Sequence, residues 1–303
     1  MASEEEYLKK HINSIEKNDD SYQKPENTLN NSRTTDLQFL SFDINELPCG
    51  QFYPKGTSLM VRAAQVREIQ SYSMVDDNNF IDVVEKMNDM LQSCVRVKYT
   101  DGKMGSYLDI KDQDRLYLIF LIRELTFQQG TALSVEHKCS CGTINSVELL
   151  RKNFRFHETD PNIQRFFDKV RNCFVFTTKN NKQFEITPPN IGLQKSFTEY
   201  IIQENNAKRT PNLAFLKIIP FMLNGITSLT YDSIKSKVSD FENMDDISFQ
   251  FLNAVVSKMN FGIKDLSKNC NSCGLEIRTE MTFPNGTSGI FVVHDAFEAF
   301  IKE

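Results

Sequence analysis

The sequence predicts an α+β fold made of two similar halves, each with strands, a cluster of helices and a hairpin that carries two cysteines. Three observations support this prediction. Segments with the period of an amphipathic helix alternate with short extended segments, their order recurs in the second half, and each half contains a closely spaced cysteine pair followed by a strand pattern. With 303 residues, 40% of them hydrophobic and 25% charged, the chain is long enough for two domains.

The composition divides the chain into three parts. Residues 1–36 are rich in Glu, Lys, Asn and Ser, and Tyr7 and Tyr22 are their only aromatic residues. Such a segment buries too little apolar surface to offset the entropy cost of folding, so we expect a flexible polar tail. Residues 37–155 form the predicted first half, with a C-x-C pair, and residues 156–303 form the second, with a C-x-x-C pair.

Turn residues and apolar periodicity define the elements of the first half. Pro48, Gly50, Pro54 and Gly56 mark two turns between extended segments. Apolar residues spaced i, i+3, i+4 and i+7 then predict helices that bury one face. The predicted elements are a strand at 58–62, helices at 65–74 and 80–94, a hairpin at Asp101 and Gly102, a helix at 112–126, and strands on both sides of Cys139 and Cys141.

The second half repeats this order of elements. Its segments at 182–197, 212–226, 242–261 and 266–283 match, in order, the segments at 58–72, 80–95, 109–127 and 133–149. The four pairs are a strand that enters a helix, an apolar helix, a long apolar helix preceded by acidic residues, and a cysteine hairpin. Four elements in the same order predict an internal duplication.

Two neighbouring aromatic residues, Phe52 and Tyr53, lie in the turn at 47–56, which we call the Pro-Gly turn. Pro and Gly near both ends make this turn rigid. Its rings either belong to a rigid hairpin that has no partner or form an anchor for another subunit, because aromatic residues concentrate in the cores of interfaces. The sequence leaves both interpretations open.

The paired cysteines are the candidate metal ligands: Cys139 and Cys141 are spaced C-x-C, Cys270 and Cys273 are spaced C-x-x-C, and Gly follows each pair. Two thiolates on a tight turn can occupy adjacent corners of a tetrahedron, and a second pair completes a site for one structural zinc ion. Residues 142–269 separate the pairs, which would meet if the two halves pack about a pseudo-twofold axis. His137 is a spare candidate ligand. The alternative interpretation is two tight turns with free thiols.

The sequence signatures of common enzymes are absent. His11, His137, His157 and His294 have no Ser, Cys or carboxylate arranged around them in a known nucleophile pattern, and the Gly-rich loops that bind nucleotide phosphates are missing. Asp109, Asp112 and Asp114 lack the Gly and the distal Glu of an EF-hand loop, so we interpret them as helix caps. We assign no catalytic residue and no small-molecule substrate, and we expect a non-enzymatic protein.

Charge and hydropathy limit the possible partners. The net charge of −5, with no basic run, predicts no general attraction to nucleic acid or to an anionic membrane. The longest apolar stretches, such as residues 116–122, are much shorter than the ~18 residues of a membrane helix. The first twenty residues lack the apolar core of an export signal, and seven cysteines are an odd number, so we expect reduced thiols or metal ligands. Proteins are therefore the expected partners.

Several motifs occur together in the chain: an LPxGxFYPxG turn at 47–56, an SLMVR strand at 58–62, a helix that ends in RELTF at 123–127, and cysteine hairpins followed by strands. Together they resemble the baseplate hub subunit family of T-even-like contractile-tailed bacteriophages. The resemblance covers residues 42–155 well and extends to 156–303 through FGIKDL at 261–266 and the Cys270 hairpin. Cys49 stands where a small polar residue is more usual, and the C-x-C spacing of the first pair also differs.

The resemblance implies a non-enzymatic structural or assembly protein of the virion's tail baseplate hub. Such a late protein is assembled in the host cytoplasm and contacts other tail hub or baseplate proteins. The rival hypothesis is a zinc-ribbon regulatory protein associated with nucleic acid, which needs a basic face near the cysteines. Acidic residues nearly balance the basic residues there. A metallo-hydrolase is less well supported, because it needs a metal site with an open position for water.

Overall fold

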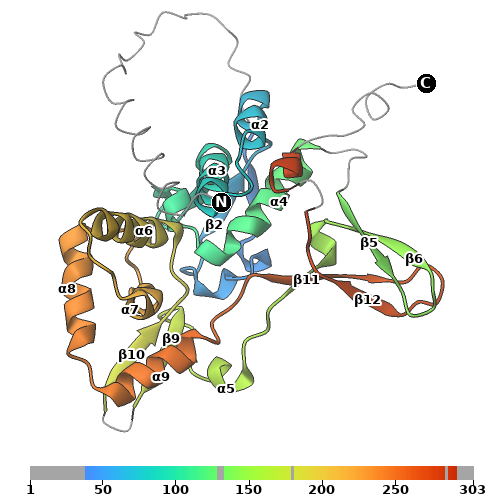
Figure 1. Ribbon diagram of the computed structural model, residues 1–303. Coiled ribbons are helices and arrows are strands. Elements are labelled where there is room, and N and C mark those ends of the chain that lie inside the picture. The colour runs from blue at the N-terminus through green and yellow to red at the C-terminus, as the bar shows by residue number, and fades with distance from the viewer. Residues whose placement is uncertain (1–37, 128–132, 179–180, 284–285, 292–303) are drawn as a thin grey trace, which may run out of the picture. The chain divides into compact units, whose positions relative to one another are not determined.

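The computed structural model describes residues 38–127, 133–178, 181–283 and 286–291, whose arrangement is drawn in Figure 1. The predicted flexible tail, residues 1–36, lies outside the described residues. Helices and several small antiparallel sheets follow one another along the chain, so the predicted α+β class is confirmed. None of the helices in these four ranges is long and apolar enough to cross a membrane.

A four-stranded antiparallel sheet in the order β1-β2-β3-β4 opens the described chain. Its strands are β1 (Leu40–Phe42), β2 (Ser58–Val61), β3 (Val95–Lys98) and β4 (Met104–Gly105), and the helices α2 (Val66–Ser73) and α3 (Phe80–Cys94) connect β2 to β3. Leu59 pairs with Val97 and Val61 with Val95, and all four side chains are buried. Alternate residues of these strands therefore face the core, as expected for a sheet with one buried face.

Helix α4 (Arg115–Thr126) lies in the core of this unit. All of its residues from 117 to 123 are buried, which is typical of a helix surrounded by other elements rather than one with a single apolar stripe. Its Phe120 ring packs on Phe154 of β7 (Phe154–Phe156), with ring centroids 5.2 Å apart. Arg123 Nε donates a hydrogen bond of 2.6 Å to the carbonyl oxygen of Ile290, so the last described residues pack on the same helix.

Two more antiparallel sheets have three strands each, in the orders β10-β9-β8 and β12-β11-β7, and β5 pairs with β6 alone. The strands are β5 (Ser134–Lys138), β6 (Ile144–Glu148), β8 (Phe167–Asp168), β9 (Cys173–Thr177), β10 (Gln183–Ile186), β11 (Ile263–Asn269) and β12 (Glu276–Thr279). The remaining helices are α5 (Pro161–Gln164), α6 (Ile191–Asn206), α7 (Leu213–Ile218), α8 (Tyr231–Glu242) and α9 (Asp246–Val256). Because β7 spans the predicted boundary at residue 155 and pairs with β11, a shared sheet connects the two predicted halves.

The four matched segments contain the same types of element in both halves. They are β2 with α2 and β10 with α6, then α3 and α7, then α4 and α9, and finally the hairpins β5–β6 and β11–β12. The elements between them differ, since the β3–β4 hairpin precedes α4 whereas helix α8 precedes α9. The internal duplication therefore stays a prediction.

The Pro-Gly turn is held from inside the protein. Asp114 is fully buried, and its carboxylate accepts hydrogen bonds from the Cys49 N–H at 2.8 Å and from the Tyr53 hydroxyl at 2.7 Å. The Tyr53 oxygen in turn accepts the N–H of Lys111 at 2.8 Å. Buried polar groups left without such partners would cost about 1–3 kcal/mol each. Asp114 thus fixes the turn to the start of α4.

The three aspartates predicted as caps have different roles. Asp109 does cap, because its side chain accepts the N–H of Ser106 in a capping box. Asp112 forms an ion pair with Arg115. Asp114 precedes α4 in the capping position, but its side chain makes no capping hydrogen bond, so the prediction is wrong for this residue. Its oxygens are occupied by the Pro-Gly turn instead.

Phe52 and Tyr53 are buried within this chain, with 3% and 5% of their surfaces exposed. The Phe52 ring makes edge contacts with Phe167 and Phe174 at 5.5 Å and with Phe261 at 4.9 Å between centroids. The interpretation of these two rings as an anchor for another subunit is therefore wrong. Phe52 thus joins the Pro-Gly turn to the second predicted half, and its edge-to-face contacts add to the gain from burial.

Residues 110–114, which we call the junction segment, connect three distant parts of the chain. Besides holding the Pro-Gly turn, the segment pairs with residues 187–191: the Ile191 N–H donates to the Ile110 carbonyl, and Lys111 Nζ donates to the Pro188 carbonyl at 2.9 Å. Gln113 donates to the Met259 carbonyl and accepts the Phe261 N–H. A change in the junction segment should therefore affect the whole described unit.

The first prediction concerns the pH dependence of stability. Burial raises the pKa of Asp114 to about 7, although the hydrogen bonds from Tyr53 and Cys49 oppose this shift. Its unfolded pKa is about 3.9, so between about pH 4 and pH 7 the folded protein binds more protons. The contribution of Asp114 to the free energy of unfolding therefore falls as pH rises through this window, by up to about 4 kcal/mol.

Urea denaturation of the wild type and of an Asp114→Asn variant from about pH 5 to pH 8 tests this expectation. The advantage of the wild type over the variant should shrink steadily as pH rises, because only the wild type titrates at this position. Asp101→Asn, which changes an exposed aspartate of the β3–β4 turn, is the matched control and should show no such trend. A difference between wild type and Asp114→Asn that does not depend on pH would contradict the prediction.

Candidate metal centre

The four predicted cysteine ligands come together in the structure. Cys139 and Cys141 lie in the turn between β5 and β6, and Cys270 and Cys273 lie in the turn between β11 and β12; Figure 1 shows the two hairpins beside each other. The Sγ atoms of Cys139 and Cys273 are 3.7 Å apart, as are those of Cys141 and Cys270, and all four lie within 4.8 Å of one another. This arrangement is a possible metal site.

Both turns close in the same way despite their different spacing. The Gly142 N–H donates to the Cys139 carbonyl, and the Gly274 N–H donates to the Cys270 carbonyl. Gly142 and Gly274 have φ values of +90° and +73°, a backbone conformation that residues with a Cβ rarely adopt. The glycine after each pair therefore allows the chain to turn back while two sulfurs point to the same side.

Asn145 was not predicted from the sequence, yet it links the two turns. Its side chain is buried, and its Nδ2 atom donates to the Thr143 carbonyl at 3.1 Å and contacts Cys270 Sγ at 3.5 Å. Its Oδ1 atom accepts the Asn271 N–H at 2.9 Å. One amide thus fixes the first turn, the second turn and one sulfur. The signal in the sequence was a polar residue two positions before Val147, on the same buried face of β6.

His137, the spare candidate ligand, does not belong to the cluster found in the described residues, which consists of the four cysteines. It lies on β5 opposite Asn145. Neutral imidazole is a common zinc ligand, but the four thiols already supply a complete tetrahedral set. All seven cysteines of the chain are free thiols, so no disulfide competes with this cluster.

Local hydrogen bonds influence which thiols ionise. The N–H groups of Cys273 and Ser272 lower the pKa of Cys270 to about 6, and hydrogen bonds with Thr143 lower the pKa of Cys141. The Leu275 N–H lowers the pKa of Cys273, but desolvation and hydrogen bonds with the other three thiols outweigh this effect and raise the pKa to about 12. Four neighbouring thiolates therefore need a cation to be stable together near neutral pH, because like charges oppose each other's ionisation.

The sulfur positions fit one tetrahedral ion. A metal–sulfur bond of about 2.3 Å implies a distance of roughly 3.8 Å between sulfurs in a regular tetrahedron. The Cys139–Cys273 and Cys141–Cys270 pairs, each at 3.7 Å between sulfurs, agree with this value. Four thiolates in a tetrahedron are a donor set that zinc and iron prefer. The sulfur positions are therefore compatible with one soft metal ion.

The second prediction tests the role of Asn145. Replacing it with Ala keeps all four ligands but removes the contact with Cys270 Sγ and the link to Asn271. Loss of a residue that orients metal ligands typically lowers affinity by about 10–100-fold, so we expect a decrease of this size with unchanged stoichiometry. Titration of the full chain with Co²⁺, whose absorption bands report tetrahedral thiolate ligands, against a competing chelator measures it.

His137→Ala is the matched control, because His137 faces Asn145 across the same pair of strands. This variant should bind Co²⁺ like the wild type. Equal affinity of Asn145→Ala and wild type, or an equally large loss in His137→Ala, would contradict the assignment.

Comparisons with known proteins found no relative of this chain. The chain was compared with protein-family models, with curated proteins and with solved structures, and none of them matched it. The chemistry of the site is therefore inferred from its own geometry.

Proposed function

We propose that the four cysteines bind one structural zinc ion and that the chain is a non-enzymatic structural or assembly protein of a bacteriophage tail baseplate hub. It acts there through contacts with other hub or baseplate proteins, after assembly in the host cytoplasm. The observation that carries the proposal is the convergence of four thiols from two distant hairpins on one small volume. A site of this kind stabilises a fold rather than catalysing a reaction.

The ligand set supports a structural role. Four thiolates fill the tetrahedral positions of zinc, so no position remains for a water molecule or a substrate. A catalytic zinc site keeps one position open, and no titratable side chain besides the four cysteines belongs to this cluster in the described residues. Zinc in this place would cross-link the β5–β6 hairpin to the β11–β12 hairpin.

The ends of the hairpins, next to the cysteines, bury little apolar surface of their own. The separate buried apolar cluster of this region consists of Cys139, Cys270 and Ile277, whereas Ile144 and Leu275 beside the turns are more than half exposed. Small modules with so few buried side chains usually need a metal or a disulfide. This need supports a bound ion.

The assignment to a baseplate hub rests on the resemblance, and the positions of its motifs support it. Phe52 of the LPxGxFYPxG turn contacts Phe261, the first residue of the FGIKDL segment, in the core. Gln113 binds the backbone of Phe261, and Asp114 binds that of Cys49. The motifs that resemble the family are thus residues that organise this fold, and a resemblance of that kind is informative about architecture.

Charges near the cysteines favour protein partners over nucleic acid, the rival hypothesis. Arg278 pairs with Glu276 at 2.8 Å, and Lys268 donates to the carbonyl oxygen of Ser146. Binding of nucleic acid by a zinc ribbon needs several basic side chains that are free to reach phosphates. The ion pair offsets the charge of Arg278, and the hydrogen bond occupies Lys268, so this face of the described chain has fewer basic side chains free to reach phosphates.

The third prediction tests the assembly role. Tagged full-length protein, recovered from cells that also produce the products of neighbouring genes, should retain tail or hub proteins identified by mass spectrometry. An untagged strain is the control for proteins that bind the matrix. Recovery of polymerase subunits or nucleic acid without tail proteins would overturn the proposal in favour of a zinc-ribbon regulator.

A further inference from the structure

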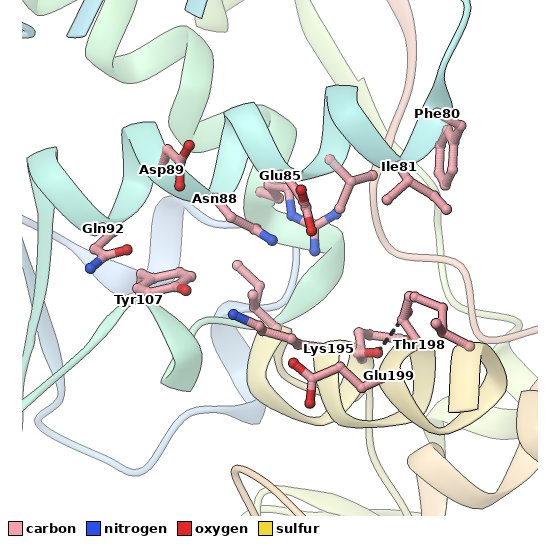
Figure 2. Close-up of a pocket in the computed structure, with 15 residues that line it drawn as sticks. Phe80, Ile81, Glu85, Asn88, Asp89, Gln92, Tyr107, Lys195, Thr198 and Glu199 are labelled. Atoms are coloured by element: carbon pink, nitrogen blue, oxygen red, sulfur yellow. Dashed lines mark hydrogen bonds between the residues drawn. The ribbon is translucent and has the colours of Figure 1, made fainter. Parts of the chain in front are cut away.

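A groove of about 340 Å³ lies between helices α3 and α6 (Figure 2). Figure 2 shows Phe80 and Ile81 at one end of the α3 wall and Gln92 at the other, with Lys195, Thr198 and Glu199 on the α6 wall. The twelve helical steps from residue 80 to residue 92 correspond to about 18 Å, or a little more than three turns. The groove is therefore long enough for a short helix.

Several apolar side chains along this groove are exposed to water. Phe80 is 79% exposed, Ile81 is 50% exposed and Ile202 on the opposite wall is 44% exposed. Helices of a folded protein usually turn such residues toward the core, and a cluster of them on one face marks an interaction surface. Contact with a partner would remove this apolar area from water.

The lining residues also contain polar atoms that lack partners. Asn88 Oδ1 and Arg115 Nε are buried and form no hydrogen bond, although Arg115 also pairs with Asp112 through its Nη2 atom. Unpaired buried polar atoms reduce stability. A bound segment with polar side chains can satisfy them after small rotations of Asn88 and Arg115.

The free charges of the groove are mainly negative. Glu85 on α3 and Glu199 on α6 line opposite walls, Asp89 adds a third carboxylate, and none of the three has an ion-pair partner among the residues that the structure describes. Among the described residues that line the groove, Lys195 is the cation without an ion pair, since Arg115 is already paired with Asp112. A positively charged partner therefore complements this groove.

We propose that the α3–α6 groove binds a basic amphipathic helix of a partner protein. Apolar side chains at positions i, i+3 or i+4, and i+7 of that helix contact Phe80, Ile81 and Ile202, and its Lys or Arg side chains face Glu85 and Glu199. Binding of an amphipathic helix between two helices is a recurrent mode of recognition. This site is independent of the metal centre and of the proposed hub function.

Charge argues against one other occupant, residues 292–303 of the same chain, which lie outside the described residues. Their sequence places apolar residues at 297, 300 and 301, but Asp295, Glu298 and Glu303 outnumber Lys302. Such a segment has the same sign of charge as the groove. Binding of these residues, or of a second copy of the chain, is therefore an outcome that would overturn the proposal.

The direct test uses two labelled peptides of about 12 residues with Leu on one helical face and either Lys or Glu on the other. Fluorescence anisotropy with the full chain should show at least about ten-fold tighter binding of the Lys peptide, and salt should weaken this binding.

Two variants of the groove, Phe80→Ser and the combined Glu85→Lys and Glu199→Lys, should each weaken binding of the Lys peptide by at least about ten-fold. Val170→Ser, which changes an apolar residue that is 90% exposed elsewhere, should leave it unchanged. Equal binding of both peptides, or unchanged binding by Phe80→Ser, would overturn the proposal.

A second measurement identifies the natural occupant. A photoreactive benzoylphenylalanine in place of Phe80 is irradiated in the full-length protein within producing cells, and the cross-linked peptide is sequenced. The expected product is a segment of another protein with apolar residues at helical spacing and an excess of Lys and Arg. Cross-links to residues 292–303 or to a second copy of this chain, an acidic segment, or no cross-link at all would contradict the proposal.

Discussion

Convergence of four cysteine sulfurs joins the turns of two hairpins that are otherwise linked to each other by the Asn145–Asn271 and Lys268–Ser146 hydrogen bonds. The sulfurs come from turns 129 positions apart in the chain, yet all lie within 4.8 Å of one another. Free thiolates at this separation would repel each other, whereas a single soft cation would turn the same proximity into bonds. The ends of the two hairpins, and with them the exposed face around Ile144 and Leu275, thus lie next to whatever occupies this centre.

The rest of the described unit depends on a second polar constraint, the buried carboxylate of Asp114. This group and its neighbours in the junction segment hold the Pro-Gly turn, the segment at 187–191 and the Phe261 backbone around helix α4. Phe52 completes the connection through ring contacts to Phe174 and Phe261. The unit tied in this way carries two separate features on its surface, the cysteine hairpins and the α3–α6 groove.

Local sequence patterns predicted the elements well, because periodicity and turn residues act over a few positions. Helix α3 coincides with the predicted segment at 80–94, and the β3–β4 hairpin turns at Gly102. The four cysteines meet, which the sequence predicted only for halves that pack about a pseudo-twofold axis. Interactions between distant residues were missed. The interpretation of Asp114 as a cap failed because its partners are 61 and 65 positions away, and the anchor role of Phe52 and Tyr53 failed because the rings that cover Phe52 come from the second half. Asn145 was overlooked because its neighbour Asn271 lies in the other hairpin.

The measurement that tests the central claim most directly is metal analysis of the purified full-length protein with two matched variants. Wild type should contain one zinc ion per chain. Cys270→Ser, which removes one ligand, should lose it, whereas Ser272→Ala, a change at an exposed non-ligand position in the same turn, should keep it. Wild-type protein without zinc, or equal zinc content in wild type and Cys270→Ser, would contradict a four-thiolate zinc centre as the link between the two hairpins.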